Sequence, residues 1–402
     1  MKHINALVLP LTVLLLSACG GSSDKEKTDT AFTSKTYITE QEELTCTDSS
    51  QPVNWEKVLE AKATKLSEYN LFSNTCDPSQ TDSAQALPYD LSVMLFTDYA
   101  SKYRFVFIPE GETATFVATE ALEFPTGTVI TKTFAMPADT AKRGLQEEKL
   151  IETRLLIKRD TGWIARNYVW NQSGTEAFRS LSGGPVTVKN LKHGVDKLSF
   201  TYSVPSEQQC LTCHQFKEKG ADKPEFRPLG PKARFLNSDY DYGHGPKNQL
   251  TKWFEEGMLT GLPEISTVQK ATPFNDDMLP SAYNGTQELL TATAKSWLDI
   301  NCGHCHRHEG QASNTAFRAD FNIPWDGNEA WHGACQVPIS GAAAGSSKII
   351  VPGNADTSLL YNRMHSTDSG LSMPSLGRAI IHVEGSALIK TWINSLSRPT
   401  CE

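Results

Sequence analysis

The sequence predicts an α+β protein with several domains, in which a mostly antiparallel β domain precedes two mainly α-helical units. Three observations support this prediction. Short strand-like runs separated by turn residues occupy much of the chain before residue 205. From Ser206 onward, apolar residues follow a helical period that Pro- and Gly-rich links interrupt. Each helical unit also carries one copy of the pattern C-x-x-C-H. We therefore expect the β domain at 51–205 and the helical units at 206–285 and 286–402.

The N-terminal residues 1–18 are typical of a lipoprotein signal peptide. Lys2 precedes an apolar run that is too short to span a bilayer as a helix, and Leu-Ser-Ala stands before Cys19. This junction resembles the bacterial lipobox, in which the cysteine is acylated and becomes the first residue. An ordinary signal peptide is the alternative. The sequence thus predicts a lipid on Cys19 that holds the protein on a bacterial membrane, facing the periplasm, and Gly20 favours the outer membrane.

Residues 19–50 are expected to form a flexible tether, because their first half is rich in Ser, Thr, Gly and charge. The β domain then begins with an amphipathic helix within 52–71. The runs expected as strands are 103–108, 114–118, 128–134, 151–158, 163–170, 185–189 and 198–204. This part contains no G-x-S-x-G, P-loop or H-E-x-x-H pattern. The formal net charge of −8 argues against a nucleic-acid partner.

The two C-x-x-C-H pentapeptides match the attachment signature of haem c. Two thiols three residues apart can add across the two vinyl groups of one porphyrin, and the histidine that follows can bind the iron. With 9 Cys and 10 His in 402 residues, chance gives roughly 0.005 such patterns per chain. A zinc knuckle would need a second cysteine pair nearby, and a thioredoxin-like pair needs no histidine. The sequence therefore predicts two covalently bound haem c groups, with thioethers at Cys210, Cys213, Cys302 and Cys305 and iron ligands at His214 and His306.

The second helical unit resembles class I cytochromes c. Helical periodicity at 287–300 runs directly into the second motif, and another helix is expected at 383–396. In class I cytochromes the first and last helices cross and pack against each other. This resemblance implies contacts that involve Trp297 and Trp392.

The sixth iron ligand of the second haem is expected to be Met373. It precedes Pro374 shortly before the last expected helix, where small cytochromes place a methionine ligand. A methionine that only fills a gap in the core is the alternative, and Met364 is the second candidate ligand.

The first haem has no such clear candidate. The corresponding Met-Pro position reads Leu262-Pro263. Met258, His244 or Met278 could serve, or the iron could be five-coordinate, and Met258 is narrowly preferred over His244. By resemblance to small cytochromes, the Pro-containing segment 228–231 is expected to offer a carbonyl oxygen to the second nitrogen of His214.

Four cysteines remain after Cys19 and the haem motifs are set aside. An even number in an oxidising compartment suggests two disulfides. Proximity along the chain favours Cys46–Cys76 and Cys335–Cys401, and free buried thiols are the alternative.

The chain resembles a family of bacterial dihaem c-type cytochrome lipoproteins that has been described mainly by sequence. The resemblance extends from about residue 88 to the C-terminus. The stretches that carry it are 88–91, 95–100, 124–128, 152–156, 168–171, 228–234, 301–306 and 351–354. It implies two covalent haems, an exported location and a possible parallel β-helix protein as partner. It implies no established substrate.

Three functions follow as hypotheses. The leading one is a membrane-tethered periplasmic dihaem cytochrome that passes single electrons to or from a redox partner in the cell envelope. The second is a dihaem oxidoreductase, either peroxidase-like or a dehydrogenase subunit, which requires an open iron face and a nearby acid or base. The third is an envelope lipoprotein whose β domain binds a partner while the haems regulate it. Electron transfer is preferred over catalysis.

Overall fold

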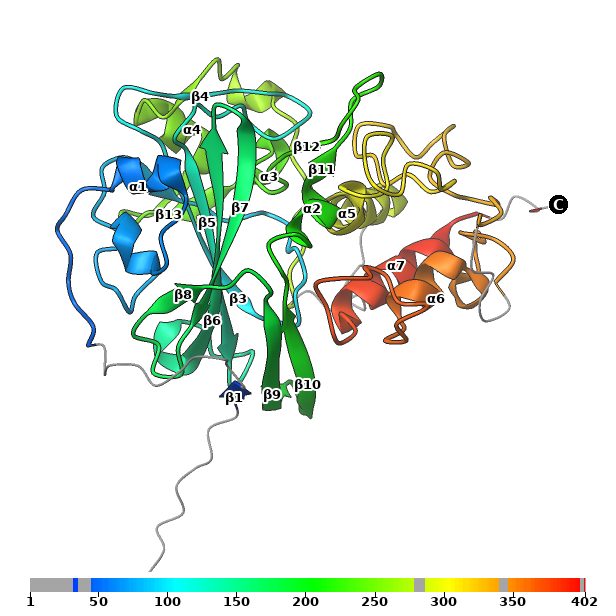
Figure 1. The fold of residues 1–402 in the computed structure, drawn as a ribbon. Helices are drawn as coiled ribbons and strands as arrows, with labels where there is room; N and C mark the ends of the chain where they lie inside the picture. Colours follow the sequence, from blue (N-terminus) through cyan, green and yellow to red (C-terminus); the bar gives the residue numbers. More distant parts are fainter. Residues whose placement is uncertain (1–31, 35–44, 278–285, 340–345, 398–400, 402) are drawn as a thin grey trace, which may run out of the picture. The chain divides into compact units, whose positions relative to one another are not determined.

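A six-stranded antiparallel sheet, in the order β2-β3-β5-β6-β7-β8, is the centre of the fold (Figure 1). Its strands are β2 (Ala86–Pro88), β3 (Ser101–Phe107), β5 (Val129–Pro137), β6 (Glu148–Arg159), β7 (Gly162–Trp170) and β8 (Ala177–Arg179). The sequence alternates along these strands, so that Phe105 and Phe107 enter one core and Val106 enters another. At the β6–β7 turn, Gly162 adopts a φ of +108°, a conformation that favours glycine.

The computed structural model describes residues 32–34, 45–277, 286–339, 346–397 and 401. The expected signal peptide, Cys19, Met278 and most of the expected tether lie outside these residues. Residues 31–402 belong to one compact unit. Within the described part, no helix combines the length and the apolar character needed to cross a bilayer.

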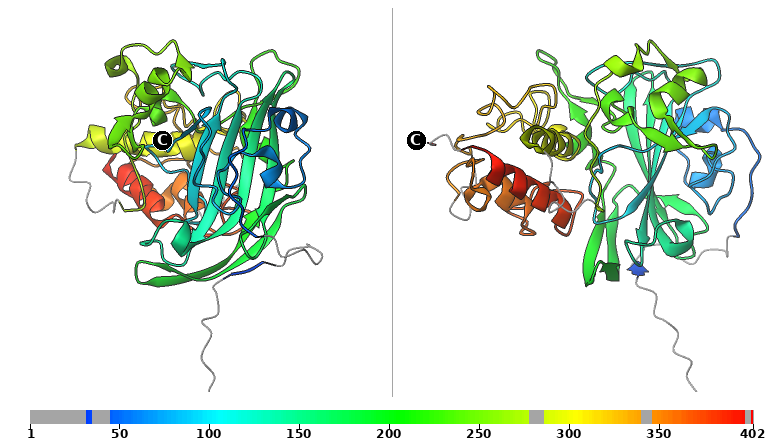
Figure 2. Two further views of the ribbon diagram at one scale, coloured as in Figure 1. Left: turned by 90° about the vertical axis from the view of Figure 1, so that its left-hand side faces the viewer. Right: turned by 180° about the vertical axis from the view of Figure 1, so that it is seen from behind.

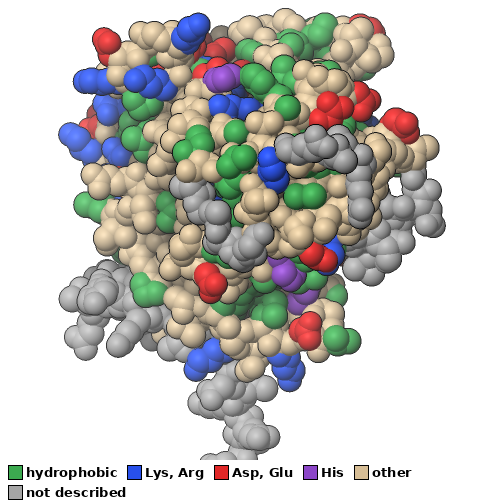
Figure 3. Space-filling view, turned by 90° about the vertical axis from the view of Figure 1, so that its right-hand side faces the viewer, with side chains coloured by type: hydrophobic (Ala, Val, Ile, Leu, Met, Phe, Trp, Pro, Cys, Tyr) green, Lys and Arg blue, Asp and Glu red, His purple; other side chains and the backbone are tan. Residues whose placement is uncertain are grey.

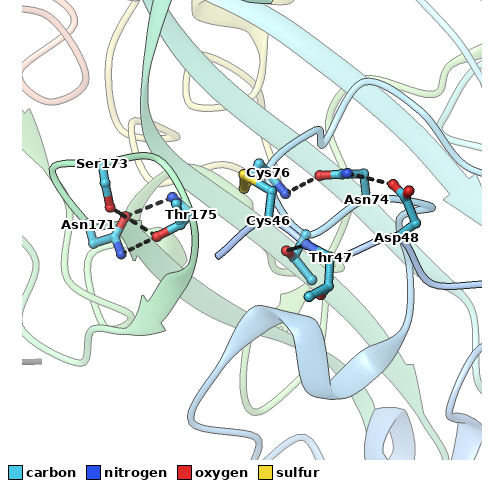
Figure 4. Close-up of a disulfide and its surroundings, with 9 residues drawn as sticks. Cys46, Thr47, Asp48, Asn74, Cys76, Asn171, Ser173 and Thr175 are labelled. Carbon is cyan, nitrogen blue, oxygen red and sulfur yellow. Dashed lines mark hydrogen bonds between the residues drawn. A yellow bond between two sulfur atoms is a disulfide. The ribbon is translucent and has the colours of Figure 1, made fainter. Parts of the chain in front are cut away.

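One face of the main sheet is covered by the segment that precedes it. The elements there are α1 (Trp55–Glu60) and η1 (Leu66–Tyr69). Tyr168 of β7 donates a hydrogen bond to the Tyr69 hydroxyl at 2.8 Å. The disulfide Cys46–Cys76 closes this segment, and Cys76 N donates to Asn74 Oδ1 at 2.8 Å (Figure 4). This is the pairing favoured by proximity.

The opposite face carries the other helices, and both views in Figure 2 show α1 on one side of the sheet and the C-terminal helices on the other. The elements of 206–285 are α2 (Cys210–His214), β11 (Gln215–Phe216), β12 (Glu225–Phe226), α3 (Ala233–Leu236), β13 (Asp239–Asp241), β14 (Pro246–Asn248), α4 (Gln249–Glu255), β15 (Leu259–Thr260) and η3 (Ile265–Thr267). Trp253 of α4 is fully buried and lies in one core with Val106. β15 also pairs with β4 (Ala114–Thr115) in parallel.

The C-terminal part contains the two longest helices among the described residues. Its elements are α5 (Gln287–Leu298), the π-helical turn η5 (Asp299–Gly303), η6 (Ala355–Thr357), α6 (Leu359–Met364) and α7 (Val383–Ser395). Trp297 and Trp392 lie in one hydrophobic core, where Trp392 contacts Trp325 edge-on with ring centroids 4.8 Å apart. A second disulfide, Cys335–Cys401, joins loop residues of this part in the pairing favoured by proximity.

The remaining described elements belong to the β-rich part. β9 (Gly184–His193) and β10 (Asp196–Val204) form a hairpin, and β1 (Phe32–Ser34) pairs with β9. The 3₁₀ turn η2 (Leu145–Glu147) leads into β6.

The predicted fold class is wrong in its two mainly α-helical units. The described residues are mostly β and irregular structure, with seven α-helices, of which only α4, α5 and α7 reach seven residues. Two physical reasons account for the error. Closely spaced prolines such as Pro224, Pro228 and Pro231 keep the helices of 206–285 short. The apolar residues of that segment enter the core of the main sheet instead of forming a core of their own.

Candidate functional site

The two C-x-x-C-H motifs lie side by side although they are far apart in the sequence. The first forms the short helix α2 directly after β10, and the second begins in η5 at the end of α5 (Figure 1). The Cys305 thiol contacts the carbonyl oxygen of Thr212 at 3.8 Å. Cys213 also lines the same cavity as Cys302 and Cys305. The structure therefore brings the expected attachment residues of both haems into one region.

The second motif turns sharply because glycine allows close packing. A Cβ at Gly303 would lie 2.8 Å from the carbonyl oxygen of Ala319, and one at Gly310 would lie 2.3 Å from that of Cys305. Larger side chains at these positions would collide with backbone atoms. The loop after the motif thus stays tightly folded around Cys305.

Each motif histidine has one ring nitrogen engaged. His214 Nδ1 lies 2.7 Å from the carbonyl oxygen of Arg227 and therefore donates to it, and the ring stacks on Phe226 with centroids 4.7 Å apart. His306 Nδ1 lies 3.2 Å from Thr315 Oγ1. Burial lowers the pKa of both histidines to about 4, so both are neutral at physiological pH.

Within the described residues, neither Nε2 of these histidines has a hydrogen-bond partner. A neutral imidazole with Nδ1–H held by an oxygen carries its free lone pair on Nε2, which is the arrangement that metal-binding histidines use. Both motif histidines could therefore bind a metal through Nε2.

A cavity of about 400 Å³ adjoins the second motif. Cys302, Cys305 and His306 line it, and so do both methionines considered for the second haem, Met364 and Met373. Its apolar walls include Phe317, Ile349, Leu359 and Leu360. This cavity could hold a flat apolar ring with thioether links, an imidazole and a methionine sulfur available from its lining.

Thr212 and Cys213 of the first motif also line the 400 Å³ cavity, and residues of this motif line three further cavities. Cys210, Cys213 and His214 line one of about 130 Å³, which also meets Lys132 and Arg154 of the main sheet. Another, of about 110 Å³, joins His214 and Cys213 to Met364 and Met373. The largest of these is about 870 Å³ and is lined by His214 but by neither cysteine of the first motif. Its described lining contains no methionine.

The structure does not bring the first-haem candidates to the first motif. Met258 is 7% exposed and packs in the core between the main sheet and α4, and it lines none of these cavities. His244 is exposed in the turn between β13 and β14. Met278 lies outside the described residues.

His304, the middle residue of the second motif, is not among the ligands predicted from the sequence. It lines both the large cavity at His214 and the cavity at the second motif, and its Nδ1 is buried without a hydrogen-bond partner in the described part of the chain. The pattern C-x-x-C-H leaves this position free, so no sequence signal identifies it.

Ion pairs fasten the second motif to the rest of the protein. Asp299 in η5 accepts hydrogen bonds from Lys232 Nζ at 3.1 Å and from Arg234 Nε at 2.7 Å. Arg307 donates to both carboxylate oxygens of Glu120 at 2.8 and 2.9 Å.

On the face shown in Figure 3, hydrophobic side chains are scattered among polar, charged and histidine side chains.

We expect Met258→Leu to leave the optical spectrum of the protein unchanged. Met258 lies in a core and not at a motif cavity, so a change of similar volume should cost less than about 1.5 kcal/mol and remove no ligand. Ferric and ferrous absorption spectra check this, with urea unfolding as the measure of stability. A loss of low-spin bands in the folded variant would restore Met258 as a ligand.

The chain has no match among family models, curated proteins or solved structures.

Proposed function

We propose that this chain is an exported, membrane-tethered carrier of single electrons that holds two covalently attached haem c groups. The observation that supports the proposal most is the repeated C-x-x-C-H motif in which each histidine has Nδ1 occupied and Nε2 free. The lipid on Cys19, the redox partner in the envelope and the possible β-helix partner remain predictions from sequence.

The residues present fit haem at the second motif. Two thiols, a neutral imidazole and two methionines line one apolar cavity, and thiols at this spacing match the two vinyl groups of a porphyrin. At the first motif the thiols and imidazole share a smaller cavity with Lys132 and Arg154, whose side-chain nitrogens can donate hydrogen bonds to carboxylate groups such as haem propionates. When bound, haem supplies an iron centre that cycles between two oxidation states by one electron.

The protein's own residues would hold and tune these groups. His214 and His306 are kept neutral by burial and oriented by Arg227 and Thr315, which favours donation from Nε2. The Cys305 thiol lies 3.8 Å from the carbonyl oxygen of Thr212, so the two motifs are next to each other. An electron carrier benefits from such closeness because both redox groups can act in sequence.

The ligand assignment gives a test of this function. We expect Met373→His to remove the spectral features of a methionine ligand and to lower the reduction potential of one haem by on the order of 100 mV or more, within the ~0.8 V range that axial ligands span. Absorption spectra and a redox titration measure both changes. Met258→Leu serves as the matched control, because that methionine lines no motif cavity.

The outcome would separate two ligand assignments. If Met364→Leu changed the spectrum while Met373→His did not, Met364 would be the ligand. Two high-spin haems that react with peroxide in the unaltered protein would contradict electron transfer as the main function.

One observation favours the oxidoreductase as a second candidate. The largest cavity meets His214, carries carboxylates including Glu123, Asp160 and Glu207, and has no methionine in its described lining. An open iron face beside such acids would permit small-molecule chemistry. Steady-state turnover of peroxide, lost on His214→Ala and kept on Met373→His, would support it.

A further inference from the structure

A buried group of ionisable side chains joins two distant parts of the chain beside the first turn of α7. Asp276, His382 and Glu384 each offer one ligand atom, and these atoms all lie within 4.8 Å of one another. His382 Nε2 is 2.9 Å from Asp276 Oδ1 and 3.6 Å from Glu384 Oε2. The group contains none of the motif cysteines or histidines.

The surroundings hold these side chains in place. The His382 ring stacks on Phe96 with centroids 4.3 Å apart and planes inclined by 6°. Glu384 accepts a hydrogen bond from the Tyr99 hydroxyl at 2.8 Å and lies 2.8 Å from His193 Nε2. His193 Nδ1 in turn contacts Thr140 Oγ1 at 2.9 Å. The carboxylate of Glu384 is therefore oriented before any ligand arrives.

The group places two buried carboxylates close together. The side chains of Asp276 and Glu384 are 10% and 5% exposed. Arg143 approaches Asp276 Oδ2 only to 3.8 Å, while its other terminal nitrogen donates to the carbonyl oxygen of Tyr99 at 2.7 Å. Buried carboxylates of this kind require a partner of positive charge.

The second carboxylate oxygen of Asp276 is also unsatisfied. Asp276 Oδ2 is buried and forms no hydrogen bond within the described residues. A buried carboxylate oxygen without a donor is uncommon in folded proteins, and a bound cation is one of its ordinary explanations.

We infer that Asp276, His382 and Glu384 bind one divalent transition-metal ion of the Zn²⁺ type. Two carboxylates and an imidazole suit such an ion, whereas Ca²⁺ takes six to eight oxygen ligands and does not favour imidazole. The ion would link the segment before α5 to the start of α7. Through Tyr99 and His193, which contact Glu384, it would also fix α7 to the strand-rich part of the protein. This inference does not depend on the proposed electron transfer.

The test is a titration of the mature, haem-loaded chain after removal of loosely bound metal with a chelator. We expect calorimetry to show one Zn²⁺ per chain. At a free Zn²⁺ concentration of about 100 times Kd, the melting temperature should rise by roughly 3–4 °C. Asp276→Asn and Glu384→Gln should each weaken binding by at least about 10-fold. The control Asp356→Asn, an exposed carboxylate paired with Lys390, should leave affinity within about 2-fold.

A second measurement keeps the inference testable if a variant fails to fold. X-ray absorption at the zinc edge of the Zn²⁺-loaded unaltered chain should show nitrogen and oxygen ligands at about 2.0–2.2 Å and no sulfur ligand at about 2.3 Å. Sulfur ligands would place the metal on cysteines and overturn the site. No stoichiometric Zn²⁺ uptake, equal uptake by folded variants, or tighter binding of Ca²⁺ than of Zn²⁺ would also overturn it.

Discussion

The double variant Cys302→Ser with Cys305→Ser is expected to leave the exported protein with one haem instead of two. Both thiols line the cavity of the second motif, and covalent attachment requires thioethers from this pair. Serine is close to cysteine in size but cannot form the thioether link. The second motif should therefore lose its haem completely.

Intact mass and haem stoichiometry by absorbance measure the result. The unaltered chain should gain the mass of two porphyrins, each motif double variant that of one, and the variant without all four cysteines none. Cys335→Ser with Cys401→Ser is the matched control, since it removes two cysteines that form a disulfide instead. An unaltered chain without porphyrin after export from a host that matures c-type cytochromes would contradict the proposal.

The sequence predicted correctly the strands that depend on residues close together in the chain. Six of the seven expected strand ranges overlap long strands of the structure, from β3 to β10, because alternation and turn residues act over a few positions. The seventh, 114–118, contains only the two-residue strand β4. The segment 228–231 was expected to supply a carbonyl to His214, and the oxygen comes from Arg227, one residue earlier.

The prediction failed where local segments depend on distant partners. The helix expected within 52–71 is interrupted at Ala61, which adopts a φ of 53° and ends α1. Apolar residues at helical spacing in 206–285 look like the core of a separate unit, yet Leu250 and Met258 pack against strand residues such as Val106. Periodicity shows which side chains are buried but not against which element.

The two candidate sites, the C-x-x-C-H motifs and the group at Asp276, differ in the same respect. The motif residues are contiguous in sequence, so a chemistry could be proposed for them from the sequence alone. The group at Asp276 draws on residues that are more than a hundred positions apart, and only the short run from His382 to Glu384 hints at it. Sites assembled by folding from single residues leave no pattern in one sequence.

The buried ion pairs of Asp299 give the largest expected effect on stability. Its side chain is 4% exposed, and its partners Lys232 and Arg234 are 6% and 3% exposed. Asp299→Ala would leave two cations buried without a counter-charge. We expect the free energy of unfolding to fall by about 3–5 kcal/mol, measured by urea unfolding. Asp356→Ala is the control, because its exposed pair with Lys390 should contribute at most about 1 kcal/mol.

The pH dependence of this effect follows from the charge on Asp299. Burial raises the pKa of its carboxyl, but Lys232 and Arg234 outweigh burial and hold that pKa below its usual value. A lowered pKa in the folded state means that the carboxylate stabilises the protein above the pKa of the unfolded chain, about 4, and stops doing so as the pH falls through the lower folded value. The difference in unfolding free energy between the unaltered chain and Asp299→Ala should therefore stay constant from pH 7 to pH 5 and shrink below about pH 4. A difference that instead grew on acidification would show that the carboxyl is protonated in the folded protein, and the second motif would then be anchored by hydrogen bonds alone.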